Sequence, residues 1–155
     1  MISNNCYSCM GNTRKELRKT ALRVLDVMEW YKQEHQVRTF VVTGTSGLSI
    51  AMALKLCSKF KEEDWDLILV RKEAEKAHGS MFELLTQRSV CDTTKTPYVF
   101  LDDFIASGDT KGRIRNSVFD KTKGMWSYVG TLSYSMSSGR YVKHVIDGNV
   151  FWSYK

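Results

Sequence analysis

Two adjacent carboxylates, Asp102 and Asp103, follow a continuous apolar run from Tyr98 to Leu101. Such a run is typical of a strand that is buried on both faces of a parallel sheet. An isolated carboxylate pair is costly inside a protein, so we expect this pair at an exposed strand tip, where it meets hydroxyl groups or a cation. Open α/β sheets bind their ligands at that edge.

A loop of small and hydroxyl-bearing residues comes directly after the carboxylates. It consists of Ala106, Ser107, Gly108, Asp109 and Thr110. We predict that a helix begins behind it, over about residues 111 to 119. A loop of this kind turns backbone N–H groups and a helix N-terminus toward a phosphate, so the sequence predicts an anion site beside the two aspartates.

The stretch from Leu101 to Thr110 resembles the phosphoribosyl pyrophosphate (PRPP) signature of the type I phosphoribosyltransferases. That signature is an apolar strand, two acidic residues, two apolar residues and a loop of the type Ala-Thr-Gly-Gly-Thr. The resemblance implies that Asp102 and Asp103 hold the ribose hydroxyls of PRPP and contact Mg²⁺ indirectly, through PRPP or water. It also implies that residues 106 to 110 wrap the 5′-phosphate. Asp109 departs from the pattern, and an anion there is unfavourable unless its side chain points away.

A second anion-receiving turn is predicted after the strand Arg38–Thr43. Glycine and hydroxyl residues follow that strand and precede a predicted helix over residues 48 to 60. Any tight strand-to-helix turn uses glycine, so the pattern alone is weak. The resemblance implies that Thr45, Ser46 and Gly47 bind the pyrophosphate of PRPP. Relatives often carry a basic residue where Ser46 stands, so that charge contact is missing here.

A third group of charged residues, Arg71 to Gly79, follows the next predicted strand, Trp65–Val70. Cations and a histidine behind a buried strand suit a mobile loop that meets phosphate charge. A salt-bridged, solvent-exposed helix start explains the same composition.

This third segment resembles the Arg-Lys-Glu-Ala-Lys-Asp-His-Gly loop of orotate phosphoribosyltransferases, with one inserted residue and with Ala77 in place of the aspartate. The resemblance implies that Arg71 and Lys72 contact pyrophosphate. It further implies that Lys76 and His78 are catalytic residues on a loop that closes over the reaction centre. In those enzymes the loop reaches the neighbouring subunit, which implies a homodimer.

The remaining elements complete an α/β pattern. Residues 12 to 36 read as an amphipathic helix that Asn12 or Thr13 can cap, with Glu16 placed to complete a capping box from Thr13. Residues 125 to 132 read as a further strand. The turn Asp147-Gly-Asn149 predicts a C-terminal β-hairpin. We therefore expect a doubly wound α/β domain, with helices flanking a mainly parallel sheet of about four or five strands.

The chain is expected to form a single domain of 155 residues. Its predicted parts are an N-terminal helical cover (1–36), a core (37–132) and the C-terminal hairpin (133–155). The net charge of +6 suits polyanionic small molecules as well as nucleic acid. No recognition helix or RNA-binding signature is present, so nucleic acid is not the expected partner.

No stretch has the length and character of a membrane span or a signal peptide, so we expect a cytoplasmic protein without membrane contact. Cys6 and Cys9 form one Cys-x-x-Cys, which could chelate a metal but has no second pair at finger-like spacing. Cys57 and Cys91 read as ordinary reduced thiols.

The combined resemblance implies Mg-dependent transfer of a phosphoribosyl group from PRPP to a nucleobase, with release of pyrophosphate. Orotate or a similar pyrimidine, or a purine, is the implied acceptor, in nucleotide salvage or biosynthesis. Asp103, or Asp102, is a candidate for handling a proton. We expect base contacts from Ser133 to Ser138. The alternative is a non-catalytic regulator that senses PRPP or a nucleotide on the same fold.

Overall fold

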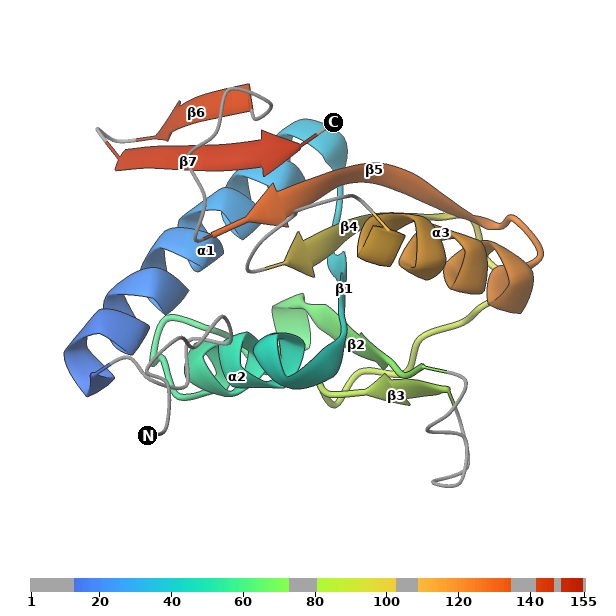
Figure 1. Cartoon of the computed structure of the whole chain (residues 1–155), viewed down its shortest axis with the longest axis horizontal. Helices are drawn as coiled ribbons and strands as arrows, with labels where there is room; N and C mark the ends of the chain where they lie inside the picture. Colours follow the sequence, from blue (N-terminus) through green and yellow to red (C-terminus); the bar gives the residue numbers. More distant parts are fainter. Residues whose placement is uncertain (1–12, 73–80, 103–108, 135–141, 147–148, 155) are drawn as a thin grey trace, which may run out of the picture.

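A computed structural model of the chain describes residues 13–72, 81–102, 109–134, 142–146 and 149–154. The strands in these segments are β1 (Thr39–Val42), β2 (Asp66–Val70), β3 (Phe82–Leu84), β4 (Thr96–Asp102), β5 (Trp126–Ser133), β6 (Val142–Ile146) and β7 (Asn149–Tyr154). Within the described residues they form one seven-stranded sheet in the order β3-β2-β1-β4-β5-β7-β6 (Figure 1).

The centre of the sheet is parallel. β1 pairs with β2 and β4, and β4 pairs with β5, all in the parallel sense. The outer strands β3, β7 and β6 are antiparallel additions at the two sides. The predicted C-terminal hairpin is confirmed, because β6 pairs with β7, and it extends the sheet from β5. The sheet has more strands than predicted because this hairpin and β3 both join it.

Helices cover both faces, which confirms the predicted doubly wound α/β class. α1 (Arg14–His35) and α2 (Gly44–Lys55) contribute to one core cluster, which also contains Phe40 and Val42 of β1. α3 (Asp109–Thr122) contributes Ile114 to a second cluster, which contains Val41. Successive β1 side chains thus enter opposite layers, as the two-residue period of a strand requires.

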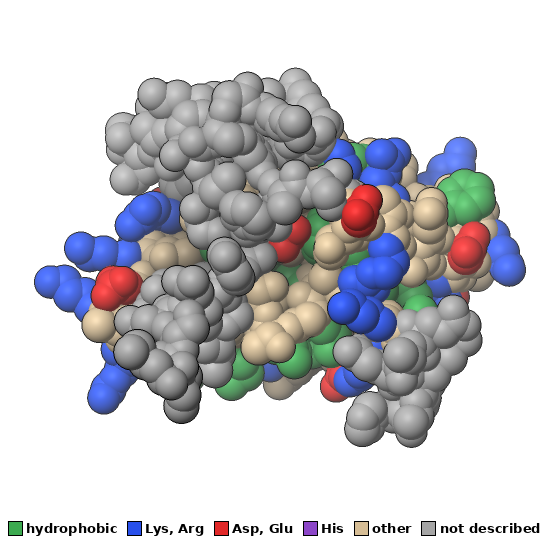
Figure 2. All heavy atoms as spheres, in the orientation of Figure 1, with side chains coloured by type: hydrophobic (Ala, Val, Ile, Leu, Met, Phe, Trp, Pro, Cys, Tyr) green, Lys and Arg blue, Asp and Glu red, His purple; other side chains and the backbone are tan. Residues whose placement is uncertain are grey.

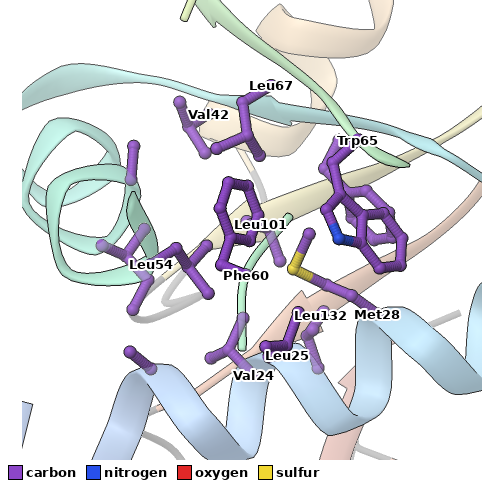
Figure 3. Close-up of a cluster of buried hydrophobic side chains, with 14 of the residues drawn as sticks. Val24, Leu25, Met28, Val42, Leu54, Phe60, Trp65, Leu67, Leu101 and Leu132 are labelled. Atoms are coloured by element: carbon purple, nitrogen blue, oxygen red, sulfur yellow. The ribbon is translucent and has the colours of Figure 1, made fainter. Parts of the chain in front are cut away.

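Figure 3 shows how the first layer is filled. Val24, Leu25 and Met28 of α1 point toward Leu54 of α2 and Leu101 of β4. All five side chains are no more than 5% exposed. Removal of such side chains from water is the main stabilising contribution to this layer.

Of the two predicted caps of α1, the structure shows Thr13, and Glu16 pairs with its hydroxyl group. The Glu16 backbone N–H donates to Thr13 Oγ1 at 3.2 Å, and Thr13 Oγ1 donates to Glu16 Oε1 at 2.9 Å. This arrangement satisfies one of the donors that every helix start leaves open. At the other end Gln36 ends the helix with a left-handed φ of 56°.

Two expectations about element boundaries are wrong. α2 begins at Gly44 and ends at Lys55, whereas we predicted a loop at 44–47 and a helix over 48–60. The chain turns at Gly44, whose φ is +67°, and the Gly47 N–H already donates to the Thr43 C=O at 3.0 Å. β3 was not predicted as a strand, since three residues are too few to show alternation.

Among the described residues, no helix combines the length and the apolar character that crossing a membrane requires.

Candidate functional site

The carboxyl ends of four neighbouring parallel strands, β2, β1, β4 and β5, lie at one edge of the sheet. From β1 the chain turns into α2 on one face, and α3, which follows β4, packs on the other face. β1 and β4 are neighbours, so their carboxyl ends flank a topological switch point. Open α/β sheets bind ligands there.

The start of α2 supplies an anion-receiving helix end at this switch point. Thr43 makes no side-chain cap to the helix, because its Oγ1 donates instead to the Val70 C=O at 2.7 Å. The N–H groups of Gly44, Thr45 and Ser46 precede the first intrahelical bond, which Gly47 makes. Backbone donors and the positive end of the helix dipole therefore meet at the ends of β1 and β2.

Gly47 allows α2 to start this close to β1. A Cβ at this position would lie 2.8 Å from Val42 Cβ and 3.1 Å from the Val42 carbonyl carbon. Real Cβ atoms essentially never come as close as 2.8 Å to another heavy atom, and a distance of 3.1 Å is tighter than nine in ten real Cβ contacts. The glycine predicted as part of a pyrophosphate loop therefore has a packing role in the structure, inside the first turn of α2.

Tyr134 ties three of these elements together from the end of β5. Its backbone N–H donates to the Asp102 C=O at 3.2 Å, and its hydroxyl donates to the Ser46 C=O at 3.3 Å. The ends of β4 and β5 and the first turn of α2 are thereby fixed relative to one another. Ser133, in the region where we expected base contacts, is 1% exposed.

Arg113 brings a positive charge to the same place from α3. Its Nη2 donates to Thr43 Oγ1 at 3.3 Å. Its Nη1 is buried and has no hydrogen-bond partner among the residues that the structure describes. Burial, and then the charge of Arg115, lowers the pKa of the neighbouring Lys111. Figure 2 shows Lys and Arg side chains over α3 and over the first turns of α1.

Asp102 lies at the end of β4, as predicted, but it is buried instead of exposed. It is the last residue of β4, and it is only 7% exposed, so the expected exposed strand tip is wrong for this carboxylate. Its β5 partner in the sheet is Ser133. β4 does not end in solvent here, because β5 still pairs with it at Ser133 and the Tyr134 backbone N–H donates to the Asp102 C=O.

The chemistry of this edge fits an indirectly held magnesium ion. Within the described residues no group of three or more His, Cys, Asp or Glu side chains could hold a metal ion. Mg²⁺ is commonly bound through one or two carboxylates together with phosphate oxygens and water. Asp102 offers one such carboxylate at the switch point, so a metal here would depend on oxygens that a ligand brings.

The cations predicted after β2 are partly engaged. Arg71 forms an ion pair with Glu83 of β3, and its N–H donates to the Met81 C=O at 2.7 Å. Lys72 is exposed. This pairing draws the Arg71 guanidinium to the outer edge strand, and no sequence pattern indicated it because β3 was not predicted.

The first residues of α3 also differ from prediction. Asp109 and Thr110 were expected in a phosphate loop, but α3 starts at Asp109. Both residues are exposed, and a carboxylate in the first turn stabilises a helix N-terminus. The helix start therefore gives a structural reason for the aspartate at position 109, where the PRPP signature commonly has glycine.

Several predicted site residues lie outside the described residues. They are Lys76, His78, Asp103, Ala106, Ser107 and Gly108. Their assigned roles stay predictions.

Sequence reasoning missed Thr43 and Arg113 as site residues. Tyr134 lies in the stretch expected to contact the base, but its bonds to Asp102 and Ser46 were not predicted. A usable signal for Arg113 was the alternation of cations in Lys111-Gly-Arg-Ile-Arg115. On a helix, Lys111 and Arg115 share a face, whereas Arg113 points elsewhere. The guanidinium carbon of Arg115 lies 4.2 Å from the centroid of the Tyr128 ring. Of the three cations, Arg115 therefore faces β5 instead of Thr43.

Comparisons with known proteins show the fold. No family model and no curated protein matches the chain. The chain resembles the crystal structure of an orotate phosphoribosyltransferase from Francisella tularensis, with a TM-score of 0.52 and 17% identity over 72% of its residues. It spans about half of that enzyme, 48% of its length.

Two further solved structures are more distant. They are a UMP synthase from Leishmania donovani (TM-score 0.44, 18% identity, 76% of this chain and 21% of that one) and a hypoxanthine-guanine phosphoribosyltransferase from Bacillus anthracis (TM-score 0.40, 17% identity, 77% of this chain and 69% of that one). The protein is thus of the doubly wound α/β class, and the N-terminus of α2 lies at its switch point. Its fold is the type I phosphoribosyltransferase fold, as the resemblance of residues 101 to 110 implied.

Proposed function

We propose that the protein is a phosphoribosyltransferase, which transfers the phosphoribosyl group of PRPP to a nucleobase in cytoplasmic nucleotide metabolism. The observation that carries this proposal is that the α2 N-terminus, Arg113 and the β4 residue Asp102 all lie at the carboxyl ends of the neighbouring strands β1 and β4. PRPP combines a pyrophosphate, a ribose diol and a 5′-phosphate. A ligand of that composition needs positively charged hydrogen-bond donors for its phosphates and a carboxylate acceptor for its hydroxyls within one site.

The parts of PRPP are assigned to different elements. Asp102 and Asp103 accept from the ribose hydroxyls, and residues 106 to 110 surround the 5′-phosphate. The first turn of α2, with Thr45, Ser46 and Gly47, receives the pyrophosphate. Arg71 and Lys72 add charge to it from the end of β2, and for Arg71 this requires exchange of its Glu83 partner.

The reaction breaks the bond between C1′ and the pyrophosphate oxygen, and a lone pair on a base nitrogen forms the new bond to C1′. The departing pyrophosphate keeps the electron pair, so negative charge grows on it as positive charge grows on the ribose. The protein's main task is then to stabilise the leaving group and exclude water. Bound Mg²⁺ would add positive charge at the pyrophosphate.

Lys76 and His78 are the proposed catalytic residues of the segment after β2, and Asp103 is the proposed residue for a proton of the base. Closure of that segment over the ligand would exclude water. Orotate or a related pyrimidine is the first acceptor to test, and a purine is the second.

We further propose that the protein acts as a homodimer. Leu48, Met52 and Leu56 lie four residues apart on one side of α2 and are 43%, 58% and 81% exposed. An apolar row of this kind is typical of a surface that another protein covers.

A regulator that binds PRPP without turnover is the second candidate. The observation that favours it is the engagement of Arg71 with Glu83, which leaves less charge free to act on a departing pyrophosphate. The two functions share the binding site and differ only in the chemical step.

One assay separates these functions. The protein is mixed with Mg²⁺, PRPP and, in turn, orotate, uracil, hypoxanthine, guanine and adenine, and pyrophosphate release is measured. Release that depends on one base supports the enzyme, whereas PRPP binding without release on any base supports the regulator. Absence of PRPP binding contradicts both.

Paired variants test the ribose assignment in the same assay. Asp102→Asn combined with Asp103→Asn should abolish PRPP binding, while Asp120→Asn, a change to an exposed carboxylate near the other end of α3, should leave it intact. Undiminished PRPP affinity in the double variant would refute the assignment.

A further inference from the structure

Arg113 crosses between the two layers that flank the sheet. It belongs to α3, which packs on one face, yet its Nη2 bonds to Thr43, which precedes α2 on the other face. The two residues are 70 positions apart in the sequence. The side chain therefore reaches the carboxyl end of β1, one of the two strands that flank the switch point.

Thr43 fixes the orientation of this guanidinium. Its hydroxyl hydrogen is given to the Val70 C=O at 2.7 Å, so the lone pairs of Oγ1 are available to Arg113 Nη2. The Nη1 group is then held beside that bond, buried and without an acceptor among the described residues. The described residues also give Arg113 no ion pair.

Arg113 as a whole is only half-buried, but a buried N–H of a cation that lacks an acceptor is unfavourable, more so than a neutral donor in the same place. The nearby start of α2 adds further N–H groups and a positive dipole end to the same region. Both features would be stabilised by one anion with several oxygens. The first turn of α2 itself, Gly44-Thr-Ser-Gly47, has no cationic side chain to offer such an anion.

We infer that Arg113 is a ligand-binding residue of the pyrophosphate subsite, and that it supplies from α3 the positive charge that the α2 turn lacks at Ser46. Thr43 is its positioning residue. This inference rests on the proposed function, because the anion is taken to be the pyrophosphate of PRPP. A guanidinium suits that role, since its fixed fork of donors matches two oxygens of one phosphate group.

The neighbouring cation Arg115 provides a matched control. It lies on the same helix, carries the same charge and contacts the Tyr128 ring instead of Thr43. A purely long-range effect of net charge would appear in variants of both arginines, whereas a direct contact would appear only at Arg113.

The test is calorimetric titration of the full chain, with Mg²⁺ present, against PRPP, pyrophosphate and ribose 5-phosphate. Arg113→Gln should bind PRPP and pyrophosphate about 10- to 100-fold more weakly than the unchanged protein, the effect of losing one charge-assisted contact. Ribose 5-phosphate affinity should change less than about twofold, because the 5′-phosphate is assigned to a different loop. Arg115→Gln should bind all three ligands as the unchanged protein does.

Arg113→Lys keeps the positive charge, so its affinity for pyrophosphate should lie between those of Arg113→Gln and the unchanged protein. It also decides the matter if Arg113→Gln does not fold. Equal affinities of Arg113→Lys and the unchanged protein for pyrophosphate, or an equal loss for pyrophosphate and ribose 5-phosphate, would overturn the inference.

Failure of the inference and failure of the proposed function give different results. If the unchanged protein binds PRPP and Arg113→Gln binds it equally well, Arg113 has no such role and the proposed function stands. If the unchanged protein binds neither PRPP nor pyrophosphate, both are wrong.

Discussion

Replacement of Gly47 by alanine should destabilise the protein, although alanine is the better helix former. Gly47 lies in the first turn of α2 and packs against the end of β1. The added Cβ would meet Val42 Cβ at 2.8 Å and the Val42 carbonyl carbon at 3.1 Å. Neither atom belongs to a side-chain end that can rotate away, so α2 and β1 must separate.

The expected size follows from two opposing effects. Overpacking of a well-packed contact costs about 1–3 kcal/mol. Replacement of glycine by alanine in a helix returns up to about 1 kcal/mol. We therefore expect Gly47→Ala to lower the free energy of unfolding by about 1–2 kcal/mol. For a domain of this size that is a fall in Tm of several degrees.

Gly112→Ala is the matched control. Gly112 lies within α3, and a Cβ there would meet nothing within 4 Å. This variant should gain about 0.5–1 kcal/mol, because only the helix preference remains. Urea denaturation followed by circular dichroism measures both. If Gly47→Ala is as stable as Gly112→Ala, the close approach of α2 to β1 is wrong, and the position of the pyrophosphate subsite is wrong with it.

Three further outcomes are expected. Thr13→Ala should lower the free energy of unfolding by about 1 kcal/mol, since α1 loses its cap, and an unchanged urea midpoint would count against the capping box. Tyr134→Phe should lower it by about 0.5–1.5 kcal/mol through loss of the hydroxyl bond to α2, with unaltered stability as the contrary result. Cys91 should react with iodoacetamide at a pH below that expected for a pKa of 9.0, because the Thr93 hydroxyl lowers the pKa of its thiol, whereas Cys57, only 8% exposed, should react slowly. Peptide mapping by mass spectrometry reads both sites, and equal rates would contradict the assignment.

The elements that carry a strong local pattern were predictable. The apolar run before Asp102 identified β4, and the Thr13 and Glu16 pair identified the start of α1, because both depend on residues adjacent in sequence. The switch-point edge followed from the order of strands and helices alone. These features also carried the resemblance that the fold confirms.

The features that were missed depend on contacts between distant residues. Whether Gly44 starts a helix or sits in a loop is decided by how closely α2 packs on β1, which no local pattern reveals. The end of β4 at Asp102 is held by Ser133 and Tyr134, which come about 30 residues later in the chain. The hydrogen bond of Arg113 to Thr43 joins elements from opposite faces of the sheet. Helical spacing could show that Arg113 faces another side of the helix than Lys111 and Arg115, but it could not predict Thr43 as the partner.

The most direct test of the account is an NMR titration of the isotope-labelled chain with PRPP and Mg²⁺. We predict that the largest chemical-shift changes among the described residues fall on the backbone amides of residues 44 to 47 and on the side chain of Arg113. Arg88 and Lys95 line a separate cavity of about 240 Å³ together with Asp66 of β2. The chemical shifts of their backbone amides should not change. Changes centred on Arg88 and Lys95, with residues 44 to 47 unaffected, would contradict the placement of the ligand at the carboxyl ends of the strands.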